Sequence, residues 1–264
     1  MRKNKIPLSP YPEQLAVMLS GMRTPKKYAA EELRRPNRTT VREAEELLAL
    51  LPDGEYLPVK EAYSLLRSFN ICVPNTALLR KEEDALSLKL SFPIVAKIDH
   101  PEIIHKSDVG GVKLNIKSNE EMADVTKDFL QRFPGANGVH VQEMVPDGLE
   151  LIIGSVRDGL LGNSVMVGLG GVWVEVMKDI SFGFPPLGKE EAMDMINSLR
   201  CEPLLAGYRG KGGVSKEALC ELLQRVSTML LSLPGIAELD LNPVIFDPAK
   251  NEFIAADARI RKGE

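Results

Sequence analysis

The chain has 264 residues, of which 44% are hydrophobic, 27% charged and 5% aromatic, with 21 glycines and 18 prolines. This composition is typical of a globular protein with a sizeable core and excludes a largely disordered chain. No apolar run approaches the ~20 residues that a membrane span needs, and the N-terminus has no signal-peptide core. We therefore expect a cytoplasmic protein without membrane contact. The cysteines and histidines share no metal-ligand spacing, which disfavours a disulfide framework or a zinc site.

Charge is unevenly distributed along the chain, although the formal net charge is only −4. Residues 1–40 carry nine Lys or Arg against three Asp or Glu, so this arm is basic and the remainder is acidic. A basic arm can bind nucleic acid, but this one lacks a run of aromatic side chains interleaved with the basic ones. We favour docking on an acidic surface of the body or of a partner protein, and expect no nucleic-acid partner.

Helical signals open the more regular part of the chain. Thr40 and Glu43 form a capping box that predicts a helix over 41–51, and Pro-Asp-Gly at 52–54 would end it. Apolar residues at helical spacing predict a second helix after Pro58.

Strands and helices alternate from about residue 71, which favours mixed α and β structure. Apolar residues on every second position predict strands over 94–98 and 112–116, with Lys97 and Lys113 on faces away from the core. Ser118 and Glu121 would cap a helix that ends near Phe133.

The chain becomes strand-rich after Gly138. We expect strands over 139–144, 149–156, 164–167 and 172–177, helices over about 189–199 and 216–233, and final strands over 236–246 and 253–260. Ser215 would be the N-cap of the long helix at 216–233. The pattern predicts a second sheet and an α+β fold class.

The connection between the first two predicted strands carries the strongest chemical signal. Gly110 and Gly111 could let backbone N–H groups approach phosphate oxygens, while Lys97 and Lys113 neutralise charge. His105 could act as a nucleophile, because a largely neutral imidazole can accept a phosphoryl group without a separate strong base. A glycine hairpin with solvated lysines and a capping histidine is the alternative that the residues alone leave open.

Several collinear motifs resemble the beta subunit of ADP-forming acetyl-CoA synthetases. They are HKSDVGGVKL, VQEMV, ELIIG, VMVGLGGVWVEVMKD, GYRG and ELDLNPV, and the likeness runs from about residue 61 to 259. The pattern is more distantly similar to the ATP-grasp lobe of succinyl-CoA synthetase. The resemblance implies an ATP-grasp fold, with an N-terminal extension over 1–54, a small lobe over 55–138 and a large lobe over 139–264.

The resemblance also implies a nucleotide site for ATP and ADP. Lys97, Lys113, Gly110 and Gly111 would face the phosphates, and Glu150 would bind the ribose. Glu143, Met144 and Val145 would lie where the adenine edge is read.

Mg²⁺ prefers hard oxygen ligands and usually bridges nucleotide phosphates. Asn242 and Asp257 match the Mg²⁺ ligands that the resemblance implies, with Glu238 and Asp240 as weaker candidates that could simply decorate a solvated strand face.

His105 matches the family histidine that relays phosphate between the alpha-subunit histidine and ADP. Asp108 would orient this imidazole, hold Mg²⁺, or only cap a turn. The resemblance also places four features on the large-lobe side of the phosphate site: the glycines of 168–171, Glu175, Asp179 and Arg209. A surface ion pair is the alternative for Arg209.

The implied activity is acyl-CoA + ADP + phosphate = acid + CoA + ATP, with this chain supplying the nucleotide half. Nothing in the sequence resembles a CoA-binding domain, so a CoA-binding alpha subunit is implied as partner, in an α2β2 hetero-oligomer. Two alternatives remain open: another ATP-grasp carboxylate ligase that makes an acyl phosphate directly, and a non-catalytic nucleotide-sensing module.

Overall fold

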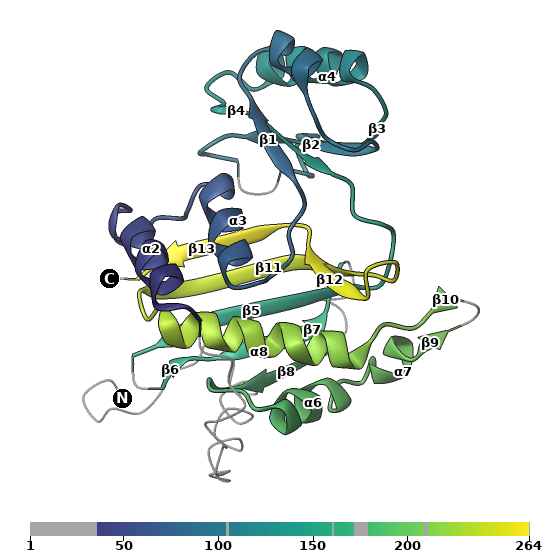
Figure 1. Ribbon diagram of the computed structural model, residues 1–264. Helices are drawn as coiled ribbons and strands as arrows, with labels where there is room; N and C mark the ends of the chain where they lie inside the picture. The colour runs from purple at the N-terminus through teal and green to yellow at the C-terminus, as the bar shows by residue number, and fades with distance from the viewer. Residues whose placement is uncertain (1–35, 104–105, 160, 172–178, 209–210, 264) are drawn as a thin grey trace. The chain divides into compact units, whose positions relative to one another are not determined.

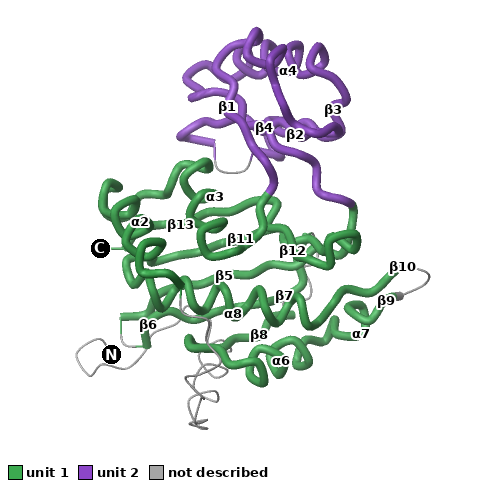
Figure 2. The backbone as a smooth tube through the Cα atoms, viewed as in Figure 1, with its two compact units in different colours: residues 1–73, 147–264 green, residues 74–146 purple. Residues whose placement is uncertain are grey.

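The computed structural model describes residues 36–103, 106–159, 161–171, 179–208 and 211–263, and they form two compact units (Figures 1 and 2). Unit 1 combines the chain up to Val73 with the chain from Asp147 onward, and unit 2 is the continuous segment Pro74–Pro146. In the part of the chain that is described, no helix is both long and apolar enough to cross a membrane.

Unit 2 is built on a four-stranded antiparallel sheet of order β1-β4-β2-β3. The strands are β1 (Thr76–Leu79), β2 (Ile94–Asp99), β3 (Val112–Ile116) and β4 (Gly138–Glu143), joined by the short helix η2 (Glu82–Ser87) and by α4 (Asn119–Arg132). Ile94, Ala96 and Ile98 are fully buried and share a core with Met122 of α4, as the alternation predicted.

Strand β3 departs from the predicted alternation. Leu114 is 56% exposed although it was expected to face the core. The ladder between β2 and β3 shifts register between Ile94 and Ala96, and Asn115 has a positive φ of 60°. An extra residue in one strand of a pair turns the neighbouring side chain to the other face.

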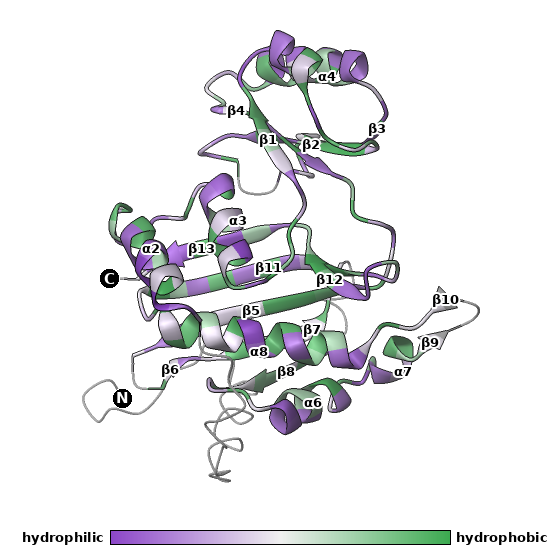
Figure 3. Cartoon of the chain, in the orientation of Figure 1, coloured by the Kyte–Doolittle hydropathy of each residue, from purple (hydrophilic) through white to green (hydrophobic). Residues whose placement is uncertain are grey.

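Unit 1 is built on a seven-stranded antiparallel sheet of order β12-β11-β5-β7-β8, in which β13 also pairs with β11 and β6 with β5. The strands are β5 (Glu150–Asp158), β6 (Gly162–Asn163), β7 (Val165–Leu169), β8 (Ile180–Gly183), β11 (Ile236–Asp247), β12 (Glu252–Ala255) and β13 (Ala258–Lys262). Figure 3 shows long hydrophobic stretches on β5, β7 and β8. The strand expected over 172–177 lies outside the described residues.

Helices contribute side chains to the same core of unit 1. They are α2 (Arg38–Ala49), α3 (Val59–Ser68), α6 (Lys189–Asn197), α7 (Glu202–Leu205) and α8 (Lys216–Ser232), and a small β9 (Gly207–Tyr208) and β10 (Lys211–Gly212) hairpin follows α7. α8 begins as predicted, because the Ser215 hydroxyl accepts a hydrogen bond from Ala218 N at 3.1 Å.

The start of α2 differs from the sequence prediction. The N-cap is Asn37, whose side chain accepts a hydrogen bond from Thr39 N at 3.1 Å, so the helix begins three residues before the predicted Val41. Asn is as strong an N-cap as Thr or stronger. Of the two possible N-cap residues, Asn37 and Thr40, the structure uses the earlier one.

The two units do not coincide with the lobes expected at 55–138 and 139–264. Residues 55–73 belong to unit 1, where the side chains of α3 are buried in the core, and β4 belongs to unit 2, where it lies between β1 and β2. The helix that precedes unit 2 in sequence thus completes the other unit.

Candidate functional site

The predicted site residues are divided between the two units. Unit 2 carries Lys97, Asp108, Gly110, Gly111, Lys113, Glu143, Met144 and Val145, and unit 1 carries Glu150, Asn242 and Asp257. His105, Glu175 and Arg209 lie outside the described residues, and Asp108 is exposed in the turn before the glycine pair.

The glycine pair of unit 2 shapes a tight turn. Gly110 has a φ of +68°, and a Cβ on Gly111 would lie 2.6 Å from Cγ2 of Ile98. Gly110 N donates to Ser107 O at 3.1 Å and Gly111 N to Lys106 O at 2.7 Å. Both N–H groups are thus paired within the loop in this structure, and their approach to phosphate oxygens stays a prediction.

The two lysines of unit 2 lie on opposite faces of its sheet. Lys97 is opposite Val112, and Lys113 is opposite Ala96. Directly opposed residues point to the same face, and consecutive residues alternate. The expectation that both lysines lie on faces away from the core is therefore corrected. Lys97 alone is on the face away from the buried Ala96, and Lys113 is exposed at the edge strand.

Glu143 fixes the end of β4. Its carboxylate accepts hydrogen bonds from Nδ2 of Asn75 and from Ser91 N, each at 2.9 Å. Met144 N donates to Pro93 O at 3.0 Å. These bonds tie the segment before unit 1 to the starts of two strands, so the Glu143 side chain holds the backbone that was expected to meet adenine.

Glu150 opens β5 in unit 1, and two glycines pack against it. Gly170 N donates to Glu150 O at 2.7 Å. Gly171 has a φ of +65°, and a Cβ there would lie 2.7 Å from Oε2 of Glu150. The glycines of the 168–171 motif therefore leave room for the carboxylate that was expected to bind ribose.

Asn242 and Asp257, which the resemblance named as Mg²⁺ ligands, are brought together in unit 1. Asn242 N donates to Asp257 O at 3.3 Å, and Oδ1 of Asp257 accepts from Ala258 N at 2.9 Å. The ladder between β11 and β5 shifts register between Leu241 and Val244, where Asn242 is exposed. Such irregularities often re-aim side chains beside functional sites.

The donor chemistry at Asn242 and Asp257 fits Mg²⁺. An amide oxygen and a carboxylate are hard ligands, and Mg²⁺ is usually held by one or two protein oxygens together with phosphates and waters. Within the described residues no group of three or more His, Cys, Asp or Glu side chains could hold a metal ion. A site with only two protein ligands would rely on the nucleotide for the rest.

The two weaker metal candidates, Glu238 and Asp240, have different surroundings. Glu238 forms an ion pair with Nε of Arg261 at 2.9 Å, which suits a strand-face residue. Asp240 is opposite Arg259, and burial is the main cause that raises the pKa of its carboxyl. Asp257 and Glu238 add to this shift and Arg259 opposes it. Asp240 therefore lies within electrostatic reach of Asp257.

Asp179 holds the backbone just before α7, and its expected place beside the phosphates stays a prediction. The side chain is buried, and its two oxygens accept hydrogen bonds from Arg200 N at 2.8 Å and Cys201 N at 2.6 Å. Both backbone donors lie just before α7. The sequence offered no signal for this pairing because the partners are more than twenty positions away.

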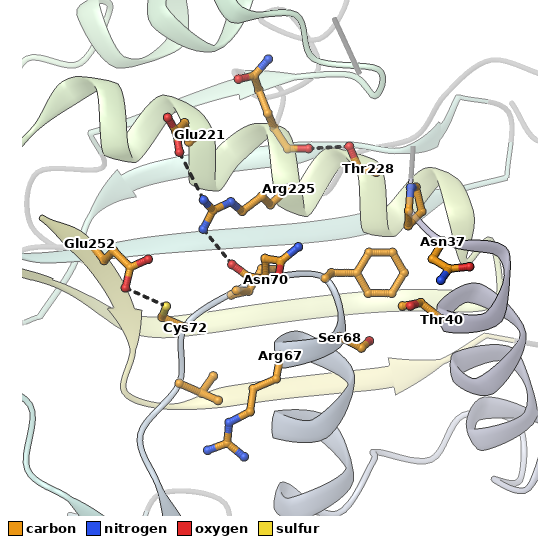
Figure 4. A pocket seen from close by; sticks show the side chains of 15 residues that line it. Asn37, Thr40, Arg67, Ser68, Asn70, Cys72, Glu221, Arg225, Thr228 and Glu252 are labelled. Carbon is orange, nitrogen blue, oxygen red and sulfur yellow. Dashed lines mark hydrogen bonds and ion pairs between the residues drawn. The ribbon is translucent and has the colours of Figure 1, made fainter. Parts of the chain in front are cut away.

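A cavity of about 1020 Å³ lies elsewhere in unit 1 (Figure 4). It is lined by α8, by the connection after α3 and by the start of α2. Arg225 crosses it, pairing with Glu221 at 3.2 Å and donating to Asn70 O at 2.8 Å. None of the predicted nucleotide or metal residues lines this cavity.

Comparison with known proteins identifies the class to which this fold and site belong. Residues 49–261 match the family model described as ATP-grasp domain. The chain is 41% identical over 208 residues to the beta subunit of acetate–CoA ligase (ADP-forming) I of Pyrococcus furiosus, covering 76% of this chain and 89% of that protein. It is 35% identical to the beta subunit of form II from the same organism, with the same two shares.

Solved structures agree with these relatives. An acetyl-coenzyme A synthetase 1 from Ca. Korarchaeum cryptofilum, in complex with coenzyme A and Ca-AMPCP, superimposes with a TM-score of 0.74 at 41% identity, over 79% of this chain and 93% of that one. A second structure, with Mg-AMPPCP and its phosphohistidine segment pointing towards the nucleotide site, gives 0.72 at 38% identity, over 85% and 99%. The chain belongs to the ATP-grasp family that contains the beta subunits of ADP-forming acyl-CoA synthetases.

Proposed function

We propose that this chain is the nucleotide-handling subunit of an ADP-forming acyl-CoA synthetase. The overall reaction is acyl-CoA + ADP + phosphate = acid + CoA + ATP. The observation that carries the proposal is the conjunction of family membership with the Asn242–Asp257 pair, in which a backbone hydrogen bond brings two residues with hard oxygen donors together at the register shift of β11.

The step assigned to this chain is phosphoryl transfer between a histidine and the nucleotide. In the ATP-forming direction the N–P bond of phosphorylated His105 breaks and an O–P bond to the terminal phosphate of ADP forms. The released imidazole nitrogen takes up one proton. Such transfers depend on positioning and charge stabilisation more than on covalent chemistry by the protein.

Each unit carries residues with a proposed role in nucleotide handling. Lys97 contacts the phosphates, Glu150 binds the ribose, and the backbone of 143–145 contacts the adenine. Asn242 and Asp257 hold Mg²⁺, which when bound neutralises charge on the phosphates. Arg209 and Asp108 remain candidates beside the transferred phosphate and His105.

A CoA-binding alpha subunit is the proposed partner, in an α2β2 assembly. The relatives from Pyrococcus furiosus are beta subunits by name, and the Korarchaeum structures contain coenzyme A and a phosphohistidine segment. We infer that the partner supplies the CoA and acid sites, and that phosphate reaches His105 from a histidine of that partner.

The test combines the purified chain with its CoA-binding partner, Mg-ATP, CoA and an acid, and follows thioester formation. We expect turnover by the wild-type pair and its loss in His105→Ala, because no imidazole is left to carry phosphate. His100→Ala is the matched control, since His100 lies in the same connection and its Nδ1 accepts a hydrogen bond from Glu102 N. Absence of thioester with the wild-type pair refutes the proposal, and full turnover by His105→Ala favours the direct carboxylate ligase.

A further inference from the structure

Tyr63 of α3 is a fully buried residue whose hydroxyl binds the backbone of the residue before a candidate metal ligand. The side chain is 0% exposed, and its hydroxyl donates a hydrogen bond to Ala256 O at 3.1 Å. Ala256 directly precedes Asp257. The hydroxyl of a core tyrosine thus ends at the turn that carries a proposed Mg²⁺ ligand.

The helix that carries Tyr63 is fixed on both sides of this turn. Ahead of α3, Leu57 N donates to Ile260 O at 2.8 Å, on the strand after the turn. Beyond α3, Ala255 N donates to Cys72 O at 2.9 Å, on the strand before it. The phenol is therefore held over residues 256–257 by contacts with both neighbouring strands.

The turn has further ties to β11. Ala256 N donates to Pro243 O at 2.9 Å, and Asn242 N donates to Asp257 O at 3.3 Å. Together with the Tyr63 hydroxyl, these bonds connect α3, Asn242-Pro243 and Asp257 in one network. Loss of the Tyr63 hydroxyl is therefore expected to alter the positions of both candidate ligands.

The electrostatics keep Tyr63 in its donating form. Burial is the main cause that raises the pKa of the phenol well above its usual range, and the Asp257 carboxylate acts in the same direction. The Arg67 guanidinium opposes the shift. The phenol consequently remains protonated at physiological pH and lies close enough to Asp257 to interact with its charge.

We propose that Tyr63 is a positioning residue for the metal site, which orients Asp257 through its hydrogen bond to Ala256 O. The inference rests on the proposed function, because it takes Asp257 as a Mg²⁺ ligand. Groups that orient metal ligands commonly change metal affinity about 10- to 100-fold when they are removed.

The test measures Mn²⁺ binding to the full-length chain with bound ADP by electron paramagnetic resonance, together with ADP affinity in EDTA. For Tyr63→Phe we expect at least about tenfold weaker Mn²⁺ binding with unchanged ADP affinity in EDTA. Ser68→Ala is the matched control, because it removes a hydroxyl that donates to a backbone carbonyl, Leu65 O, on the same helix. Thermal unfolding verifies that each variant is folded.

Two further variants make the outcomes distinct. Wild-type Mn²⁺ affinity in Tyr63→Phe overturns the inference, as does a loss that appears only in Tyr63→Leu, which would assign the effect to ring packing. Asp257→Asn is measured in parallel. If Asp257→Asn binds Mn²⁺ like the wild type, the metal assignment of the proposed function fails. If Asp257→Asn weakens Mn²⁺ binding but Tyr63→Phe does not, the positioning role of Tyr63 fails and the metal assignment stands.

Discussion

Individual candidate residues in each unit are fixed by contacts that join distant parts of the sequence. Glu143 is held by Asn75 and Ser91, and Glu150 lies against Gly170 and Gly171. Because a single added methyl group at Gly171 would collide with the Glu150 carboxylate, this glycine is the sharpest probe of the ribose assignment.

We expect Gly171→Ala to weaken nucleotide binding by up to about tenfold. The new Cβ would lie 2.7 Å from Oε2 of Glu150, and a φ of +65° disfavours alanine, at a cost of roughly 1 kcal/mol or more. Calorimetric titration with ADP measures the effect. Gly159→Ala is the control, since a Cβ there has no neighbour within 4 Å. Equal affinities for the two variants would contradict the assignment.

At the residue scale, the resemblance named Asn242 and Asp257 together, and the structure brings their backbones into contact. Asn242 lies inside β11, and its N–H donates to Asp257 O in the turn between β12 and β13. Their role as Mg²⁺ ligands stays a prediction. In the glycine loop, the pairing of the N–H groups depends on the local conformation of the loop. The backbone partners of Asp179 lie in a segment more than twenty positions away. Sequence pattern carries no information on either.

Local sequence signals predicted the starts of α8 and α4 correctly. They did not predict the start of α2 or the register between β2 and β3. Ser215 caps α8, and the Ser118 hydroxyl accepts from Glu121 N at 3.2 Å ahead of α4. The β2–β3 register could not be predicted, because the connecting loop does not determine which residues oppose each other. This is why the face of Lys113 was misjudged.

At the scale of elements, Ser215→Ala should lower the free energy of unfolding by roughly 1 kcal/mol. The variant removes the side-chain acceptor of Ala218 N at the start of the longest described helix, whose buried face contributes to the core of unit 1. Urea unfolding followed by circular dichroism measures the change. Ser232→Ala at the other end of α8 loses only a hydroxyl that donates to Thr228 O, and should stay near the wild type. A Ser215→Ala variant as stable as Ser232→Ala would refute the cap's contribution.

On the scale of the whole molecule, the chain forms unit 1 from two separated stretches. The family match begins at residue 49, so the basic arm and most of α2 precede it. The expected division at residue 54 missed that α2 and α3 are part of the unit 1 core. An amphipathic pattern identifies the buried face of a helix, but it does not determine which sheet that face packs against.

Deletion of residues 1–35 should weaken association with the CoA-binding partner and leave nucleotide affinity unchanged. The cut is placed before Asn37 so that α2 keeps its cap. The expected reason is loss of the basic arm, which we propose docks on an acidic protein surface. Analytical ultracentrifugation and ADP titration report the two quantities. Intact assembly, or loss of ADP binding, would contradict this role.

The bridges that close unit 1 also bear on the order of events during synthesis. Tyr56 pairs with Arg261 and Cys72 with Ile254, so both flanks of α3 pair with residues that are synthesised after the whole of unit 2. Unit 2 is one continuous segment, Pro74–Pro146. We therefore expect unit 2 to fold first on the ribosome, while α3 remains unpaired until β12 and β13 emerge.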